Sequence, residues 1–236
     1  MSIYTSLSGM LVHQFRQDVT ANNIANVNTT GFKSSRVDLQ ENYAMSGAHA
    51  GATPRSLAPG AFLSTDRSLD MAVEGRGFFP VKTPSGTAAF TRDGTFHTDA
   101  EGNIVNSNGY RLDVDFTLPE GTNGLRISPD GFVYANSADG TRELGRISLA
   151  HFFNPQGLDA SGNNLYLQSA ASGPAVYGYP GENGFGRVLS GSLETSNVSL
   201  VQEMTDMIIN QRGMEVNLKT TQTYDSMFVT LINMKR

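Results

Sequence analysis

The chain has 236 residues, 17 basic and 22 acidic, and its formal net charge of −5 argues against binding to nucleic acid. It contains no cysteine, which excludes disulfide bonds, thiolate metal sites and cysteine nucleophiles. No apolar run approaches the roughly 20 residues that cross a bilayer, and Gln14, Arg16 and Asp18 interrupt the start of the chain, so we expect neither membrane insertion nor a secretory signal peptide.

A long helix is predicted at the N-terminal end. Between positions 3 and 24, apolar or uncharged residues recur in alternating steps of four and three, the spacing of a helix that packs along one face. These residues are Ile3, Leu7, Met10, Gln14, Gln17, Ala21 and Ile24. The segment from Asn28 to Gly31 predicts the helix end, with Gly31 suited to a left-handed C-terminal cap.

The middle of the chain has a different pattern. Residues 34–68 are rich in small residues and contain Pro54 and Pro59, which predicts a connector or extended arm. From 69 to 195, short β-type runs alternate with turn signals such as Asp93-Gly94, Asn108-Gly109 and Asp130-Gly131. These residues predict an inserted antiparallel β domain.

The same 4-3 spacing returns after residue 199. Its members are Leu200, Met204, Met207, Gln211, Met214, Leu218 and Thr221. We therefore predict an α+β fold in which long N- and C-terminal helices (1–33 and 196–236) pack as a coiled-coil-like core domain, with the arm (34–68) and the β domain (69–195) between them. Polar residues on both stripes weaken a core made by one chain, so we expect other copies to complete it.

Three motifs with possible chemistry have simpler interpretations. Gly75-Arg76-Gly77 lacks the last glycine of a dinucleotide fingerprint and precedes a β run instead of a helix. His97 and Asp99 share a strand face without a third ligand nearby. Asp113 and Asp115 fit a solvated strand better than a pair of glycosidase carboxylates. We therefore expect no enzyme activity, no metal site and no cofactor.

Several stretches resemble the bacterial flagellar rod and hook axial proteins. The run from Ala21 to Lys33 (ANNIANVNTTGFK) is similar to the N-terminal signature of that family, and residues 69–79 (LDMAVEGRGFF) and 91–96 (TRDGTF) are similar to the start of its β domain. Residues 181–186 and 193–198 resemble the distal-rod members most. The segment 41–66 is short for such a member, so the proximal-rod members stay an alternative, while the longer hook proteins fit less well.

This resemblance implies a structural subunit of the basal-body rod, which polymerises into the tubular drive shaft that transmits torque from motor to hook and surrounds the export channel. Its partners would be copies of itself, other rod subunits, hook subunits, the surrounding ring bushing and the flagellar type III export apparatus. The rod would cross the periplasm, and its subunits would be exported without a cleaved signal peptide. The expected subunit-interface residues are Leu7, Met10, Asn22, Asn23, Asn26, Gly31, Phe32, Ser196, Asn197, Met204, Met207, Gln211, Met214 and Leu218.

A protein of another class fits the same order of elements. In a secreted adhesin or binding module, the helices would only tether the β domain. An adhesin must be reachable from outside intact cells, whereas a rod subunit is not. Surface access therefore distinguishes the two hypotheses.

Overall fold

The computed structural model describes residues 3–42, 47–119, 124–137 and 140–234. The chain divides into two compact units. The helical unit consists of Met1–Val27, Lys33–Ser56 and Val198–Arg236, and the β unit of Asn28–Phe32 and Leu57–Asn197. Both ends of the chain therefore belong to the same unit.

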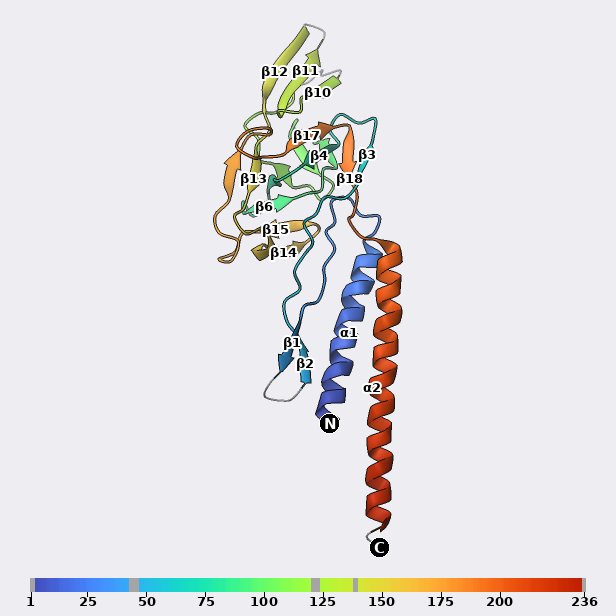
Figure 1. Cartoon of the computed structure of the whole chain (residues 1–236). Coiled ribbons are helices and arrows are strands. Elements are labelled where there is room, and N and C mark those ends of the chain that lie inside the picture. Colours follow the sequence, from blue (N-terminus) through green and yellow to red (C-terminus); the bar gives the residue numbers. More distant parts are fainter. Residues whose placement is uncertain (1–2, 43–46, 120–123, 138–139, 235–236) are drawn as a thin grey trace. The chain divides into compact units, whose positions relative to one another are not determined.

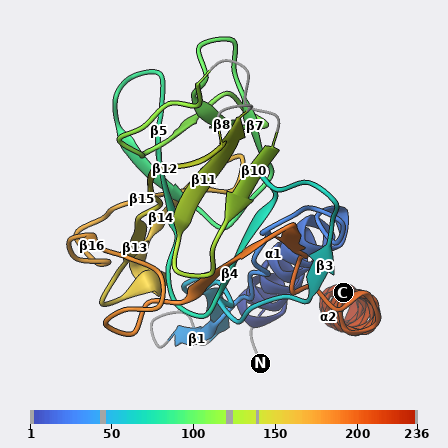
Figure 2. The ribbon, with the colours of Figure 1, turned by 90° about the horizontal axis from the view of Figure 1, so that it is seen from above.

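Two helices and one hairpin form the helical unit. Helix α1 spans Ile3–Ala25 and helix α2 spans Leu200–Met234, and the two run side by side (Figures 1 and 2). Strands β1 (Leu39–Asn42) and β2 (Gly47–Ala50) pair antiparallel and lie on the other side of α1 (Figure 1). The amide of Ala48 donates a hydrogen bond to Ser8 Oγ at 3.4 Å.

The predicted coiled-coil-like core is wrong, although helices do occur at both ends of the chain. The helices meet through residues that lie one position before the predicted stripes. For example, Asn23 on α1 contacts Glu203 on α2, whereas the predicted stripes contain the next residue of each helix, Ile24 and Met204. One residue corresponds to a rotation of about 100° around a helix, so the apolar stripes turn away from the contact. Hydrogen bonds between polar side chains and close approaches at glycine determine which faces meet.

Antiparallel strands make up the β unit, which confirms the predicted β region. Its largest sheet has seven strands in the order β14-β15-β6-β5-β9-β8-β7. Strands β10, β11 and β12 form a second sheet (Figure 2). Two-stranded pairings join β17 to β4, β18 to β3 and β13 to β16. The bounds are β3 Phe62–Ser64, β4 Met71–Glu74, β5 Phe79–Lys82, β6 Ala88–Thr91, β7 Phe96–Thr98, β8 Ile104–Asn106, β9 Arg111–Leu112, β10 Gly124–Ile127, β11 Phe132–Ser137, β12 Gly140–Arg146, β13 Leu149–His151, a 3-10 turn Pro155–Gly157, β14 Asp159–Gly162, β15 Leu165–Leu167, β16 Val176–Gly178, β17 Arg187–Ser190 and β18 Ser192–Glu194.

Most of the predicted turns connect neighbouring strands. Asn108-Gly109 joins β8 to β9, and Asp130-Gly131 joins β10 to β11. Asp93-Gly94 differs, because it does not close a hairpin: β6 before it pairs with β5 and β15, while β7 after it pairs with β8. The carbonyl of Gly94 accepts from the Met71 amide at 3.0 Å, and a Cβ at Gly94 would lie 1.5 Å from the Met71 carbonyl oxygen. Glycine is needed there for close approach.

The core of the β unit holds two apolar clusters. Phe79, Phe96 and Leu149 are fully buried members of the larger one. In the smaller one, the rings of Phe90 and Phe152 meet edge to face with centroids 4.7 Å apart. Burying each such side chain contributes about 1.5–3 kcal/mol, so this unit has its own source of stability.

The segment that follows α1 is bound into the β unit by hydrogen bonds. Thr30 Oγ1 donates to Asp93 Oδ1 at 2.8 Å, and Asn164 Nδ2 donates to the Thr30 carbonyl at 2.9 Å. The Gly31 amide donates to the Glu194 carbonyl at 2.8 Å. Although Gly31 has the predicted positive φ, of 67°, α1 ends six residues earlier, so this glycine is a docking residue and not the helix cap.

Glu194 connects three parts of the β unit. Its carboxylate lies 3.4 Å from Arg92 Nη1, both side chains are buried, and its Oε1 accepts the Gly60 amide at 3.0 Å. Arg92 also donates to the carbonyls of Val73 and Gly75 at 3.1 and 2.7 Å. With the Gly31 bond, Glu194 holds the exit from α1 and the start of the returning chain against β4.

Replacing Gly31 with alanine should destabilise the β unit. Its Cβ would lie 2.5 Å from the Asp93 amide nitrogen, in a backbone conformation that disfavours alanine, so we expect a loss of at least about 2 kcal/mol in urea unfolding followed by circular dichroism. Gly109→Ala is the control, because Gly109 has a φ of 80° with nothing within 4 Å of its Cβ; it should lose about 1 kcal/mol. Equal losses would contradict the docking role.

Candidate assembly surface

Asn23 is the central polar residue of the contact between α1 and α2. Its Nδ2 donates to Glu203 Oε1 at 2.9 Å and to the Ser35 carbonyl at 2.8 Å, and its Oδ1 accepts the Ser35 amide at 3.0 Å. The side chain is only 2% exposed. One amide group thus fixes α2 and the chain that follows the helix relative to α1.

Further along, the helices approach closely at glycine. His13 Nδ1 lies 3.5 Å from Asn210 Oδ1, and a Cβ at Gly213 would lie 2.4 Å from the His13 ring. A Cβ at Gly9 would lie 2.9 Å from Asn217 Nδ2. These contacts, with Asn23 to Glu203, define an antiparallel register. We call this line of small and polar contacts the polar seam.

Apolar side chains lie mainly away from the polar seam. Among the described residues of α1 and α2, one apolar side chain is buried, that of Val12. The buried polar residues of the two helices are Ser6, Thr20, Asn23 and Asn210. The large apolar side chains that remain exposed are Tyr4, Leu7, Leu11 and Phe15 on α1, and Leu200, Val201, Met204, Ile208, Ile209, Val216, Leu218, Met227, Phe228, Val229, Leu231, Ile232 and Met234 on α2. Apolar surface on this scale is typical of a protein contact site.

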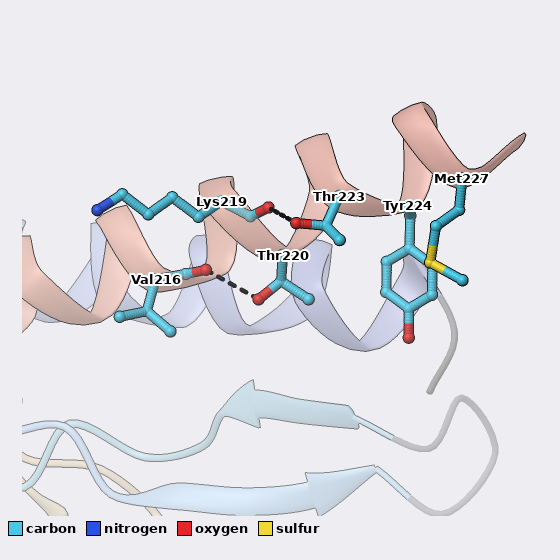
Figure 3. Close-up of a pocket in the computed structure, with 6 residues that line it drawn as sticks. All are labelled: Val216, Lys219, Thr220, Thr223, Tyr224 and Met227. Carbon is cyan, nitrogen blue, oxygen red and sulfur yellow. Dashed lines mark hydrogen bonds between the residues drawn. The ribbon is translucent and has the colours of Figure 1, made fainter. Parts of the chain in front are cut away.

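A hollow of about 490 Å³ lies against α2 near its C-terminal end (Figure 3). Thr220 Oγ1 donates to the Val216 carbonyl at 2.9 Å, and Thr223 Oγ1 donates to the Lys219 carbonyl at 2.8 Å. Because these hydroxyls bond back to the helix, each threonine has its donor satisfied without an outside partner. The hollow is lined by Val216, Lys219, Thr220, Thr223, Tyr224 and Met227.

The predicted interface residues fall into two groups. In the helical unit, Leu7, Asn22, Met204, Gln211 and Leu218 are exposed. Met10, Asn26, Met207 and Met214 there are half-buried, and Asn23 is buried within the chain. In the β unit, Gly31 is buried, and the Asn197 amide donates to the Phe32 carbonyl at 3.4 Å; Phe32, Ser196 and Asn197 are half-buried.

Spacing alone missed the residues of the polar seam. Gly213 inside a long helix carried a usable signal, because a helical glycine costs about 0.5–1 kcal/mol relative to alanine and therefore needs a packing reason. That reason is the ring of His13. The pairing of Arg92 with Glu194 had no sequence signal, since the two lie 102 positions apart.

Burial raises the pKa of Glu203 above its ordinary value of 4.5, and nearby Asp206 acts in the same direction. The hydrogen bond from Asn23 opposes this shift. The charged carboxylate is therefore less favourable in the polar seam than in water.

The described residues form neither a metal site nor a membrane-spanning helix. Within them, no three His, Asp or Glu side chains come together to hold a metal ion, and His97 lies exposed on β7. Neither α1 nor α2 has a stretch apolar and long enough for a bilayer span.

Known proteins match the chain along its whole length. The flagellar basal-body rod protein FlgG of Borreliella burgdorferi is 38% identical over 261 positions, which cover 100% of this chain and 98% of that protein. This chain belongs to the flagellar basal-body rod protein family. FlgG of Bacillus subtilis is 39% identical, covering 100% of this chain and 99% of the relative. The flagellar hook protein FlgE of Salmonella typhimurium is 38% identical over 136 residues, covering 56% of this chain and 32% of that protein.

Three family models of flagellar proteins match different parts of the chain. The model for flagella basal body rod proteins matches residues 3–33, which contain α1. The model for the D1 domain of the flagellar hook protein FlgE/F/G matches residues 72–135, and the model for the C-terminal part of flagellar basal body rod FlgEFG proteins matches 189–234. The relatives are structural rod proteins, so the predicted lack of enzyme activity is confirmed by the family.

Glu203→Gln should stabilise the helix pair at neutral pH. Because the folded-state pKa is raised, wild-type Glu203 contributes its full stability below the unfolded pKa near 4.5, and this contribution is lost as pH rises through the raised folded pKa. Glutamine keeps an acceptor for Asn23 and carries no charge. Thermal melts at 222 nm between pH 4 and 8 should show a flatter pH dependence in the variant.

The control for this measurement is Glu215→Gln, at an exposed carboxylate on the same helix. It should change the melting temperature at neutral pH only slightly, because an exposed ion pair contributes little to stability. An unchanged slope in Glu203→Gln would mean that this carboxylate does not limit the stability of the polar seam.

Proposed function

We propose that this chain is a subunit of the distal flagellar rod, which polymerises into the tubular drive shaft between motor and hook and surrounds the export channel. The observation that carries the proposal is the match to FlgG over the full chain, at 38–39% identity. A polymer subunit also needs surface that its own fold leaves uncovered, and the two helices carry a long set of exposed apolar side chains.

The contacts between subunits would come first from the helical unit. Of the residues expected from the sequence, the exposed Leu7, Met204, Gln211 and Leu218 and the half-buried Met10, Met207 and Met214 can contact a neighbour without unfolding the monomer. Asn22 and Asn26, at the end of α1, would add to the contacts of the helical unit. Phe32, Ser196 and Asn197 would form a separate contact of the β unit. Asn23 and Gly31 would act indirectly, by fixing the chain around these contacts.

The wider surroundings follow from the same proposal. Within the family, rod and hook proteins build one axial structure, so other rod subunits and hook subunits are partners. We further expect that the assembled rod crosses the periplasm inside a ring bushing, and that the subunit leaves the cytoplasm through the flagellar type III export apparatus. The adhesin alternative is not supported, because the whole chain is related to rod proteins.

The test is complementation of a strain that lacks this protein. The full chain should restore motility and complete basal bodies, whereas Met204→Asp combined with Leu218→Asp should leave rods without hooks in electron micrographs. Both side chains are exposed, so the monomer should still fold, and burial of unpaired carboxylates should prevent assembly. Asn108→Asp, which adds one carboxylate in the exposed β8–β9 turn away from the helices, is the control and should restore motility.

A tag placed in the same β8–β9 turn tests location. It should bind antibody only after the outer membrane is permeabilised. Labelling of intact cells would support an exposed adhesin instead, and normal motility of the aspartate variants would overturn the role proposed for the helices.

A further inference from the structure

The charges on the two helices are distributed unevenly. Residues 3–15 of α1 and 226–234 of α2 carry no Asp, Glu, Lys or Arg. The charged residues of the helices lie elsewhere, at Arg16, Asp18, Glu203, Asp206, Arg212, Glu215, Lys219 and Asp225. A contact that excludes water is least costly where no charge loses its hydration, so the two charge-free segments are the most suitable for burial.

The register of the polar seam shows that α2 extends beyond its partner. Gly9 is level with Asn217, so Ile3, six residues earlier, is level with Thr223, six residues later. Residues 224–234 therefore have no α1 beside them, and this end of α2 extends past α1 in Figure 1. At 1.5 Å per residue the overhang is about 16 Å long.

The end of the overhang is apolar over most of its circumference, and its polar residues Ser226, Thr230 and Asn233 line one narrow face. Met227, Phe228, Val229, Leu231 and Ile232 are all more than half exposed. So wide an apolar face on a helix is normally buried against a partner.

Two hydroxyl groups within the overhang already have acceptors in the helix. Thr230 Oγ1 donates to the Ser226 carbonyl at 2.9 Å, and Ser226 Oγ donates to the Thr223 carbonyl at 2.8 Å. Neither hydroxyl would lose a donor bond to water if the overhang were buried. The segment is thus suited to a dry contact that this chain does not provide.

On these grounds, and resting on the proposed function, we infer that the α2 overhang of one copy packs against the outward stripe of α1 in a second copy. That stripe consists of Tyr4, Leu7, Leu11 and Phe15, all exposed and all in the charge-free half of α1. The outward face of α2 at the same level is less suitable, because it carries Arg212, Glu215 and Lys219.

The geometry also argues against pairing between two overhangs. Identical patches that pair with each other close into a dimer and stop growth, whereas contact between two different patches leaves one of each free and extends a filament. A rod must grow, so the overhang and its receiving stripe must be different surfaces. This requirement selects α1 as the receiver.

The absence of cysteine allows a direct test, because each introduced cysteine is unique in its chain. Untagged Leu11→Cys protein is mixed with size-tagged Val229→Cys protein under assembling conditions, and disulfides are formed by mild oxidation. We expect the mixed dimer to exceed both homodimers severalfold. In one chain Leu11 is level with Glu215, so Val229 lies about 21 Å further along, beyond the roughly 7 Å between Cα atoms that a disulfide spans.

Val201→Cys in place of Leu11→Cys is the matched control, because Val201 is an exposed apolar position outside the charge-free segments and outside the proposed contacts. It should give little mixed dimer with Val229→Cys. The inference is overturned if the control cross-links as well as Leu11→Cys, if the Val229→Cys homodimer dominates, or if assembled protein gives no cross-link. If the unmodified chain does not assemble at all, the proposed function fails as well.

A charge placed in the overhang gives an independent measurement. Val229→Lys should raise the protein concentration needed for assembly at least about tenfold, because a charge would be buried without a partner. Its monomer should melt at the wild-type temperature, since Val229 is 58% exposed. Gln222→Lys is the control, because Gln222 is exposed on the same helix just before the overhang begins, and this variant should assemble normally. Assembly of Val229→Lys at the wild-type concentration would overturn the inference without affecting the proposed function.

Discussion

The polar seam between α1 and α2 is the constraint on which the surface of the helical unit depends. Asn23, His13 and Asn210 orient the two helices by hydrogen bonds, and Gly9 and Gly213 let them approach closely. Hydrogen bonds of this kind contribute only about 0.5–1.5 kcal/mol each, but they specify which faces meet. Because the small and polar faces are used inside the chain, the apolar faces are left outside. A tighter apolar seam would make a more stable monomer and remove the surface that a polymer needs.

The β unit has a different role. It binds the segment that follows α1 and the segment that leads to α2. Glu194 is buried with Arg92, and desolvation of such a pair usually costs about as much as the attraction returns. The pair therefore adds little net stability. Its value is positional: the same residue accepts the Gly60 amide through its side chain and the Gly31 amide through its backbone. An apolar replacement could fill the space but could not accept a hydrogen bond from Gly60.

Sequence patterns predicted the elements better than the faces through which they pack. Helices at both ends and an antiparallel β region follow from periodicity and turn residues, which are local signals. The helix contact failed because an apolar stripe was assumed to face the nearest helix, as in a self-contained protein. The true contact residues, such as Asn23 and Gly213, lie one position earlier and carry no hydrophobic signal. Gly31 shows the same limit, because its positive φ could be predicted but the loop between β6 and β7 that it packs against could not.

A rod subunit must avoid non-specific association as a monomer and still bind other subunits through defined surfaces. The helices meet both needs by separating charge from apolar surface along their length. Arg212, Glu215 and Lys219 keep one face of α2 hydrated, where a neighbour could otherwise attach in many registers. The charge-free segments then offer a contact that is strong only when a complementary apolar helix occupies it. The positions of the charge-free segments therefore set the register between helices of different copies. Within one chain, the polar groups of the polar seam set the register between α1 and α2.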